Sequence, residues 1–290
     1  MFQLFTDTDT DITLEEAKKY GYKLISMPYS TSDEKTVYPY EDYDIFDSKS
    51  FYDMLRNGEL TKTFAISPGK HIEYFEPFLK EGKDILYVHF SKAMSGTFNA
   101  MNLAIEELKE KYPERSIYTI DTKGITILSN IIVKEIGDMY LQGKCIEEIL
   151  EWSNKEVDHF ATYFFADNLN FFKKSGRVSN VTATMGNIIG FKPIIYMDDN
   201  GTMTNIGKER GRIKAINKLI EYVDLLNVDI FNHRVIIGHT DALELAQKLG
   251  EKLIEKYGSN LKIEYVVVNP TAGSHCGPDT VGVAFYAKHK

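Results

Sequence analysis

Residues 84–112 read DILYVHFSKAMSGTFNAMNLAIEELKEKY, and this stretch decides the fold class. Its first seven residues, 84–90, form the kind of apolar run that is typical of a buried strand. From Phe98 onward, apolar residues recur at spacings of three and four, which predicts an amphipathic helix. A strand that leads directly into a helix indicates an α/β protein with a parallel sheet.

The same alternation of strand-like and helix-like segments continues along the chain. Strands are expected near 2–5, 23–27, 116–121, 159–167, 233–240, 262–270 and 280–288, a β-hairpin at 192–207, and helices at 124–143, 147–159 and 242–258. We therefore expect two α/β domains with largely parallel or mixed sheets flanked by helices. The predicted N-terminal domain spans 1–155 and the predicted C-terminal domain spans 156–290.

Composition excludes several classes of protein. The chain has 290 residues, of which 43% are hydrophobic and 26% are charged, as in an ordinary globular protein. A net charge of −8 argues against a broad nucleic-acid or anionic-membrane surface. We expect no integral membrane segment and no signal peptide, and two cysteines without CxxC spacing make a disulfide framework improbable. Cytoplasmic localisation is the resulting expectation.

An acidic segment, TDTDTD at 6–11, follows the first predicted strand. It lacks the Gly and Glu positions of a calcium-binding loop. A magnesium-dependent phosphatase with Asp7 as nucleophile and Asp9 beside it is one hypothesis, because a strand followed by D-x-D-x-T suits that chemistry. The alternative, which we favour, is that these Thr and Asp side chains cap the loop and the next helix or line a site.

Ser95 precedes the predicted helix and allows three interpretations. The surrounding residues do not match the G-x-S-x-G pattern of a serine hydrolase, which makes a nucleophile the weakest of the three. Ser95 could be a plain helix N-cap. Alternatively, Ser95 and Thr97 on either side of Gly96 could bind a carboxylate or phosphate at the helix N-terminus, where Gly96 permits close approach. The sequence alone does not decide whether Ser95 is a helix N-cap or part of an anion-binding site.

Two further segments carry candidate functional residues. His275 lies in 269–282, which is rich in Gly and Pro and is expected to form a loop between two strands. The basic run at 208–214 stands at the start of a predicted helix, where cations oppose the helix dipole, and it therefore indicates an anion or acidic partner nearby. The sequence has no nucleotide-binding fingerprint and no histidine cluster with metal-ligand spacing, so we expect no cofactor.

Several separated motifs together resemble those of one known family. They are TDTDTDI (6–12), TFAISP (63–68), SKAMSGT (91–97), ADNLNFFKKSGRVS (166–179), GFKPII (190–195), KERGRIKA (208–215) and GSHCGP (273–278). With these motifs in this order, the chain resembles the DegV family, whose fatty-acid-binding proteins serve as the FakB subunit of bacterial fatty acid kinase.

The resemblance implies a long-chain fatty acid buried between two α/β domains. It implies that Ser95 and Thr63 hold the carboxylate, with His275 in the same hydrogen-bonding group. It further implies that Arg177 and Arg210 lie where an ATP-dependent fatty acid kinase subunit docks, and that the protein presents its ligand without catalysing a reaction. TFAISP departs from the T-S-Q-P-like motif of the family at residues 64–66.

Our leading hypothesis is therefore a non-catalytic fatty acid carrier, with the phosphatase and the serine hydrolase as alternatives. Burial of an acyl chain contributes about 0.8 kcal/mol per CH₂, so an apolar wall is required. The expected wall is formed by 163–165, Phe171, Phe172 and 183–191.

Overall fold

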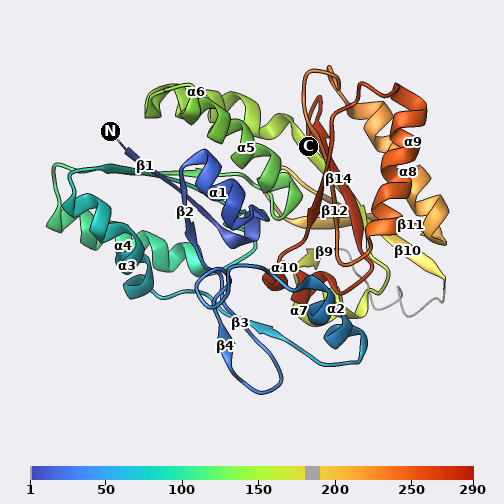
Figure 1. Ribbon diagram of the computed structural model, residues 1–290, viewed down its shortest axis with the longest axis horizontal. Coiled ribbons are helices and arrows are strands. Elements are labelled where there is room, and N and C mark those ends of the chain that lie inside the picture. The colour runs from blue at the N-terminus through green and yellow to red at the C-terminus, as the bar shows by residue number, and fades with distance from the viewer. Residues whose placement is uncertain (1, 180–189) are drawn as a thin grey trace.

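The computed structural model describes residues 2–179 and 190–290, and these form three sheets with helices packed around them (Figure 1). The expected α/β class, with parallel and mixed sheets flanked by helices, is confirmed. Among these residues, no helix is long and apolar enough to span a membrane.

The first sheet belongs to the N-terminal half and is entirely parallel. Its strands lie in the order β2 (Tyr22–Ile25), β1 (Phe2–Asp7), β6 (Asp84–His89) and β7 (Ile117–Asp121). Five of the six residues of β6 are buried, as its unbroken apolar run predicts for a strand covered on both faces. The helix expected after it is α4 (Thr97–Lys111).

The second sheet belongs to the C-terminal half and is mixed. Its strands lie in the order β13 (Ile263–Val267), β12 (Val235–His239), β14 (Val281–Tyr286), β8 (Phe160–Phe165), β10 (Phe191–Met197), β11 (Met203–Arg210) and β9 (Val178–Ser179). The strands β10 and β11 form the expected hairpin, whose turn is stabilised by Asp198 Oδ1 accepting from Asn200 N–H at 3.0 Å. Successive residues of β12 and β14 point to different hydrophobic clusters, so both faces of this sheet are covered.

The helices complete a layered arrangement. Besides α4, the longer ones are α3 (Pro68–Lys80), α5 (Ile127–Leu141), α6 (Ile146–Glu156), α8 (Arg212–Leu226) and α9 (Leu243–Tyr257). Shorter helices are η1 (Thr8–Thr10), α1 (Leu14–Tyr20), α2 (Ser48–Arg56), η2 (Val157–His159), α7 (Asn170–Ser175) and α10 (Pro270–Cys276). Helices α8 and α9 cover one face of the second sheet, and α5 covers the other.

Helix α5 connects the two halves through a shared hydrophobic core. Ten of its fifteen residues are buried, in agreement with the apolar helix predicted at 124–143. The largest hydrophobic cluster contains α5 side chains together with Leu4 and Leu86 of the first sheet and Ile236 and Ala284 of the second. Each sheet belongs to one half of the chain, but the division into domains at residue 155 stays a prediction because this core spans it.

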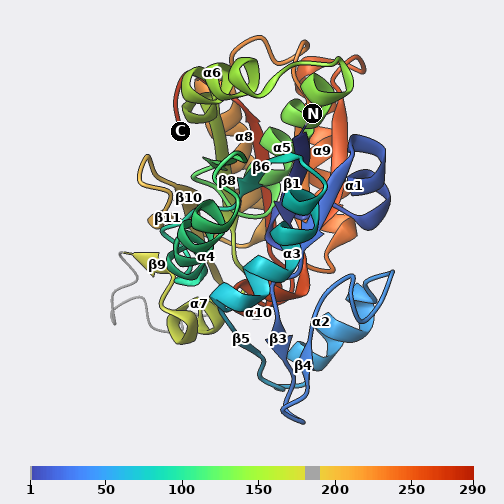
Figure 2. The same cartoon turned by 90° about the vertical axis from the view of Figure 1, so that its left-hand side faces the viewer.

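A smaller unit extends from the main body between β2 and α3. It contains the sheet β4 (Thr36–Val37), β3 (Tyr29–Ser30) and β5 (Lys62–Thr63), together with α2. Figures 1 and 2 both place this unit at one end of the molecule. Tyr52 Oη donates to Val268 O at 2.8 Å, and Arg56 forms ion pairs with Asp241 at 2.5 Å and Asp279 at 2.9 Å. These contacts attach α2 to the C-terminal half.

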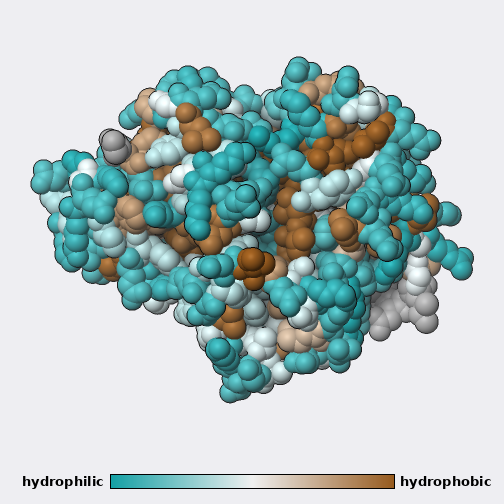
Figure 3. All heavy atoms as spheres, viewed as in Figure 1, coloured by the Kyte–Doolittle hydropathy of each residue, from teal (hydrophilic) through white to brown (hydrophobic). Residues whose placement is uncertain are grey.

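The surface is largely polar on the face shown in Figure 3, with apolar side chains exposed toward its centre. A mixture of this kind is normal for a water-exposed protein, in which single apolar side chains remain on the surface. The charged exterior agrees with the net charge of −8.

Gly201, in the turn of the β10–β11 hairpin, contacts the N-terminal half of the chain and allows this contact to be tested. Its φ is +75°, and Ser91 Oγ donates to its carbonyl at 2.7 Å. A Cβ at this position would lie 2.2 Å from Ser91 Oγ and 3.2 Å from the backbone of Lys123. Gly201→Ala should therefore lower the free energy of unfolding by about 1–3 kcal/mol, measured by urea denaturation.

The matched control is Gly207→Ala on the same hairpin, because a Cβ there meets no atom within 4 Å. This control should change the free energy of unfolding by less than about 0.5 kcal/mol. Equal unfolding midpoints for both variants would contradict the proposed docking contact.

Candidate functional site

A pocket partly open to solvent lies where the carboxyl ends of strands from both sheets meet, and its empty space, together with the solvent at its mouth, is about 1090 Å³. Asp9 follows β1, Ser95 follows β6 and Ile127 follows β7 in the first sheet, while Val268 follows β13 in the second. The carboxyl ends of parallel strands are the usual ligand-binding edge of α/β sheets.

Most of the pocket wall is apolar. Among the residues that form it are Met27, Phe90, Met94, Ile127, Phe164 and Met197. Methionine side chains are flexible and fill irregular apolar space, which suits a wall around a long, bendable ligand. The sequence interpretation did not identify these methionines, because an isolated apolar residue carries no signal of which cavity it faces.

The acyl wall expected from the sequence is only partly present. Phe164 lines the pocket, but its neighbours Tyr163 and Phe165 point to the other face of β8 and pack in the second core. Phe172 is buried in the main core, and the ring of Phe171 lies over Gly277. Side chains alternate along a strand, so three consecutive aromatics cannot face one cavity. Residues 183–189 of the expected wall lie outside the described residues.

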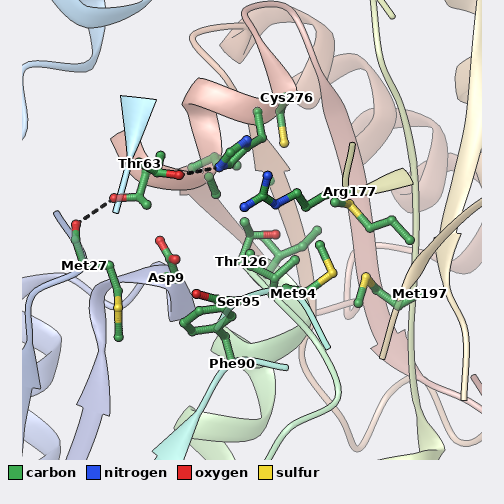
Figure 4. Close-up of a pocket in the computed structure, with 18 of the residues that line it drawn as sticks. Asp9, Met27, Thr63, Phe90, Met94, Ser95, Thr126, Arg177, Met197 and Cys276 are labelled. Carbon is green, nitrogen blue, oxygen red and sulfur yellow. Dashed lines mark hydrogen bonds between the residues drawn. The ribbon is translucent and has the colours of Figure 1, made fainter. Parts of the chain in front are cut away.

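Thr63 and His275 meet at one end of the pocket (Figure 4). Thr63 Oγ1 lies 2.9 Å from His275 Nε2, although the residues are 212 positions apart in sequence. Burial, followed by the nearby charge of Arg177, lowers the pKa of His275 to about 4. The imidazole is therefore neutral near pH 7. When Nε2 carries its hydrogen and donates to Thr63, the Thr63 hydroxyl hydrogen is available to a ligand.

Ser95 is not the N-cap of α4: the N-cap is Gly96, and it makes no side-chain capping bond. Ser95 Oγ accepts a hydrogen bond from Thr97 N–H at 3.2 Å, and the residue lines the pocket. Because Oγ acts as acceptor toward the backbone, its own hydrogen can be donated into the pocket.

The other residues of the S-G-T motif have different surroundings. Gly96 lines the pocket, and a Cβ there would meet no atom within 4 Å. Close packing therefore does not require glycine at this position, and the absence of a side chain leaves open space in the pocket. Thr97 is fully buried and is not among the pocket-lining residues; its Oγ1 accepts from Ile66 N–H at 3.3 Å. Thr97 therefore fixes residues 64–66, of which Phe64 and Ala65 line the pocket.

The two predicted partner-facing arginines are both exposed but lie apart. Arg177 lines the pocket immediately before β9, whereas Arg210 ends β11 and is not a lining residue. Val178 pairs with Met203, seven residues before Arg210 along β11. Arg177, one residue before Val178, therefore lies opposite Thr202, eight residues before Arg210. At about 3.3 Å per residue, the two arginines are separated by about 26 Å along the strand, too far to contact one carboxylate.

The basic segment at 208–214 does have an acidic partner, as expected. Arg212, at the start of α8, donates from Nε to Asp167 Oδ1 at 2.7 Å and lies 3.6 Å from Asp279. Asp279 also pairs with Arg56, so Arg212 joins the ion pairs that attach α2 to the C-terminal half.

The segment around His275 is not a loop, as the sequence interpretation assumed, but contains α10. Asn269 caps this helix by accepting from Ala272 N–H, and Pro270 occupies its first turn. Asn followed by Pro is a helix-start signal as well as a turn signal, and it could have identified α10. The helix then ends at Gly277, whose φ is +71°.

The acidic segment after β1 is almost completely buried, with Asp9 at the pocket wall. Asp7 Oδ2 accepts from Tyr87 Oη at 3.0 Å and Phe90 N–H at 3.2 Å. Asp11 Oδ1 accepts from Asn269 N–H at 2.8 Å and from its side-chain amide at 2.7 Å. Burial raises the pKa of both Asp7 and Asp11 to about 7. The expected site-lining role is confirmed for Asp9, while Asp7 and Asp11 have structural bonds.

These contacts favour a binding site over the two enzyme hypotheses. Asp7 is committed to hydrogen bonds and is not a pocket-lining residue, which disfavours a nucleophile. His275 contacts Thr63 rather than Ser95, so the described residues do not bring a histidine base to the serine. Within the described ranges, no group of three or more His, Cys, Asp or Glu side chains could hold a metal ion.

Solved structures share this arrangement of sheets and helices. A stearic-acid-binding protein from Eubacterium ventriosum has a TM-score of 0.84 and 21% identity, with 99% of both chains covered. A DegV family protein from Eubacterium eligens, loaded with heptadecanoic acid, has a TM-score of 0.84 and 22% identity, covering 99% of this chain and 100% of the other. At these identities the similarity establishes the fold.

Sequence comparison establishes the family. A DegV domain-containing protein of Clostridium perfringens is 31% identical over 294 residues, covering 100% of this chain and 98% of the relative. The family model described as "Uncharacterised protein, DegV family" matches residues 1–288. With residues 1–288 matched by that model and a curated family member 31% identical over the whole chain, the chain belongs to the DegV family.

Proposed function

We propose that this protein binds one long-chain fatty acid in the pocket and presents its carboxylate to a separate, ATP-dependent fatty acid kinase subunit. The protein itself catalyses no reaction and needs no cofactor. It acts in the cytoplasm, where ATP is available to the kinase. Solved relatives described as stearic-acid-binding or loaded with heptadecanoic acid support the choice of ligand.

The observation that carries this proposal is the polarity of the pocket. Its wall is mainly apolar, and Thr63, Ser95 and His275 are among the polar residues that line it. Figure 4 shows Thr63 and Ser95 on either side of Asp9. A ligand with a long apolar chain and one small polar head group matches both parts. Small-molecule sites in proteins typically have this composition, in which few polar groups fix the orientation.

Burial of the acyl chain supplies most of the affinity. Each CH₂ removed from water contributes about 0.8 kcal/mol, so a chain of about sixteen carbons gains enough to offset the loss of translational freedom. The carboxylate must lose water at the same time, which is costly without hydrogen-bond donors. The hydroxyls of Thr63 and Ser95, which both line the pocket, can act as those donors.

The surface near the pocket supports a role for a partner protein. Arg177 at the pocket and Arg210 at the far end of β11 are both exposed. Because about 26 Å separates them along the strand, a single small anion cannot bridge them, whereas a protein interface of standard size can cover both.

Binding of a fatty acid is the first prediction of this proposal. Protein purified from a bacterial host should carry a bound acyl chain, seen in native mass spectrometry as a mass above that of the denatured chain. After delipidation, palmitate or oleate should raise the melting temperature. An empty protein that gains no thermal stability from either ligand would refute the proposal.

Removal of the hydroxyl donors should weaken binding. Ser95→Ala and Thr63→Val each delete a hydrogen bond to a charged group, worth about 1.5–3 kcal/mol, so the Kd for palmitate should rise about 10- to 100-fold. The matched control is Ser259→Ala, at an exposed turn between α9 and β13. The Kd of each of the three variants is measured by displacement of a fluorescent fatty acid. Equal Kd values for Ser95→Ala and the control would argue against the assigned head-group site.

The partner surface has a separate test. With purified kinase subunit, ATP and palmitate-loaded protein, Arg210→Ala should reduce acyl phosphate formation at least tenfold while leaving the Kd for palmitate unchanged. Lys248→Ala, on the exposed face of α9, removes the same charge elsewhere and should have no effect. A wild-type rate with Arg210→Ala would exclude Arg210 from the kinase interface.

A further inference from the structure

Asp9 is a buried acid without a hydrogen bond to its Oδ1 oxygen. The residue is only 4% exposed, and Oδ1 finds no partner among the described residues. Its neighbours Asp7 and Asp11 are different, because each accepts hydrogen bonds from backbone or side-chain donors. A buried polar atom without a partner is costly, at about 1–3 kcal/mol, and indicates that something else completes the site.

The position of Asp9 indicates what that partner is. Asp9 lines the pocket, and in the view of Figure 4 its carboxyl lies between Thr63 and Ser95. These are the two residues whose hydroxyls would hold the ligand head group. Met94 and Met197 lie farther from Asp9 in that view, while Met27 and Phe90 lie on the same side as Asp9. The unpartnered acid therefore lies beside the two hydroxyl-bearing residues.

The groups around Asp9 disfavour its ionised form. Burial is the main cause that raises its pKa well above the ordinary range, and the charges of Asp7 and Asp11 raise it further. From β6, Tyr87 faces the segment, and from α10 come His275 and Cys276, all neutral near pH 7. The α5 side chain that contacts this segment is the uncharged Asn130, which donates to Thr10 O.

One positive group shares the pocket. Arg177 lines it and is exposed, so water weakens its field at a buried acid.

We propose that Asp9, as a neutral carboxylic acid, donates a hydrogen bond to the carboxylate of the bound fatty acid. This inference rests on the proposed function, and it adds a specificity-determining residue to the head-group site. The ligand binds as a carboxylate and Asp9 is protonated before binding, so the pair shares one proton and carries one negative charge. No proton is released or taken up when binding occurs with Asp9 neutral.

This arrangement makes binding depend on pH and on ligand charge. Once Asp9 loses its proton, two carboxylates face each other in a site of low dielectric, and like charges repel. Affinity for a fatty acid should therefore be full at lower pH and fall as pH rises through the pKa of Asp9. A fatty alcohol of the same length carries no charge and should show no such loss.

The experiment measures the Kd of delipidated protein for palmitate and for 1-hexadecanol from pH 6 to pH 10, below the aggregation concentrations of both ligands. For the wild type, palmitate affinity should fall at least tenfold over this range while hexadecanol affinity does not fall. Asp9→Asn keeps a donor and cannot ionise, so its palmitate affinity should fall much less with pH than that of the wild type, and the remaining fall reports the ionisation of Asp7 and Asp11, whose pKa is about 7. Asp9→Ala should bind palmitate about tenfold more weakly than the wild type at pH 6.

The control is Asp44→Asn, which removes the same charge from an exposed loop position and should follow the wild-type profile. Melting temperatures establish that each variant is folded. If an Asp9 variant fails to fold, the pH dependence of the wild-type Kd for palmitate and for 1-hexadecanol still tests the inference. The inference is overturned if wild-type palmitate affinity is constant with pH, or if folded Asp9→Asn retains the wild-type decline. If no protein binds palmitate at any pH, the proposed function itself is wrong.

Discussion

The packing of α5 between the two sheets is the constraint on which the rest of the molecule depends. Ile127, at the start of this helix, lies over Gly238 and Gly282, which face each other on β12 and β14. A Cβ at Gly238 would approach Ile127 Cγ2 to 2.4 Å, so only glycine permits this close contact. Since α5 also packs on η1 and α1, it sets the distance between the sheets and thereby the width of the pocket.

The same packing brings polar groups from distant segments to one place. Thr126 N–H donates to Asp9 O at 2.7 Å, and Thr126 itself has a φ of +53°, which is unusual for a β-branched residue. Strain of this kind, about 1–3 kcal/mol, persists only where the surroundings determine the backbone. The start of α5 is thus held against the acidic segment, and the contact between Thr63 and His275 closes the opposite side of the head-group site.

Much of this fold could be predicted from the sequence, because the strong strand and helix patterns at 84–112 and 124–143 report local burial. The motifs also identified Thr63, Ser95 and His275, which the structure places at one pocket. The direction of individual side chains could not be predicted. Which residue of 163–165 faces the ligand depends on strand pairing, and the unpartnered state of Asp9 depends on chain segments that are far away in sequence.

A head-group site built from neutral donors has a consequence for the proposed role. A buried cation would bind a carboxylate strongly, and removing the ligand would then leave an uncompensated charge, at a cost of several kcal/mol. With hydroxyls, a neutral imidazole and Asp9 protonated as proposed, the head-group site would bind the carboxylate without a buried cation. Affinity then comes mainly from the acyl chain, while the carboxylate stays reactive toward a kinase. Such a division suits a protein that must hold a ligand securely and still offer its head group for chemistry.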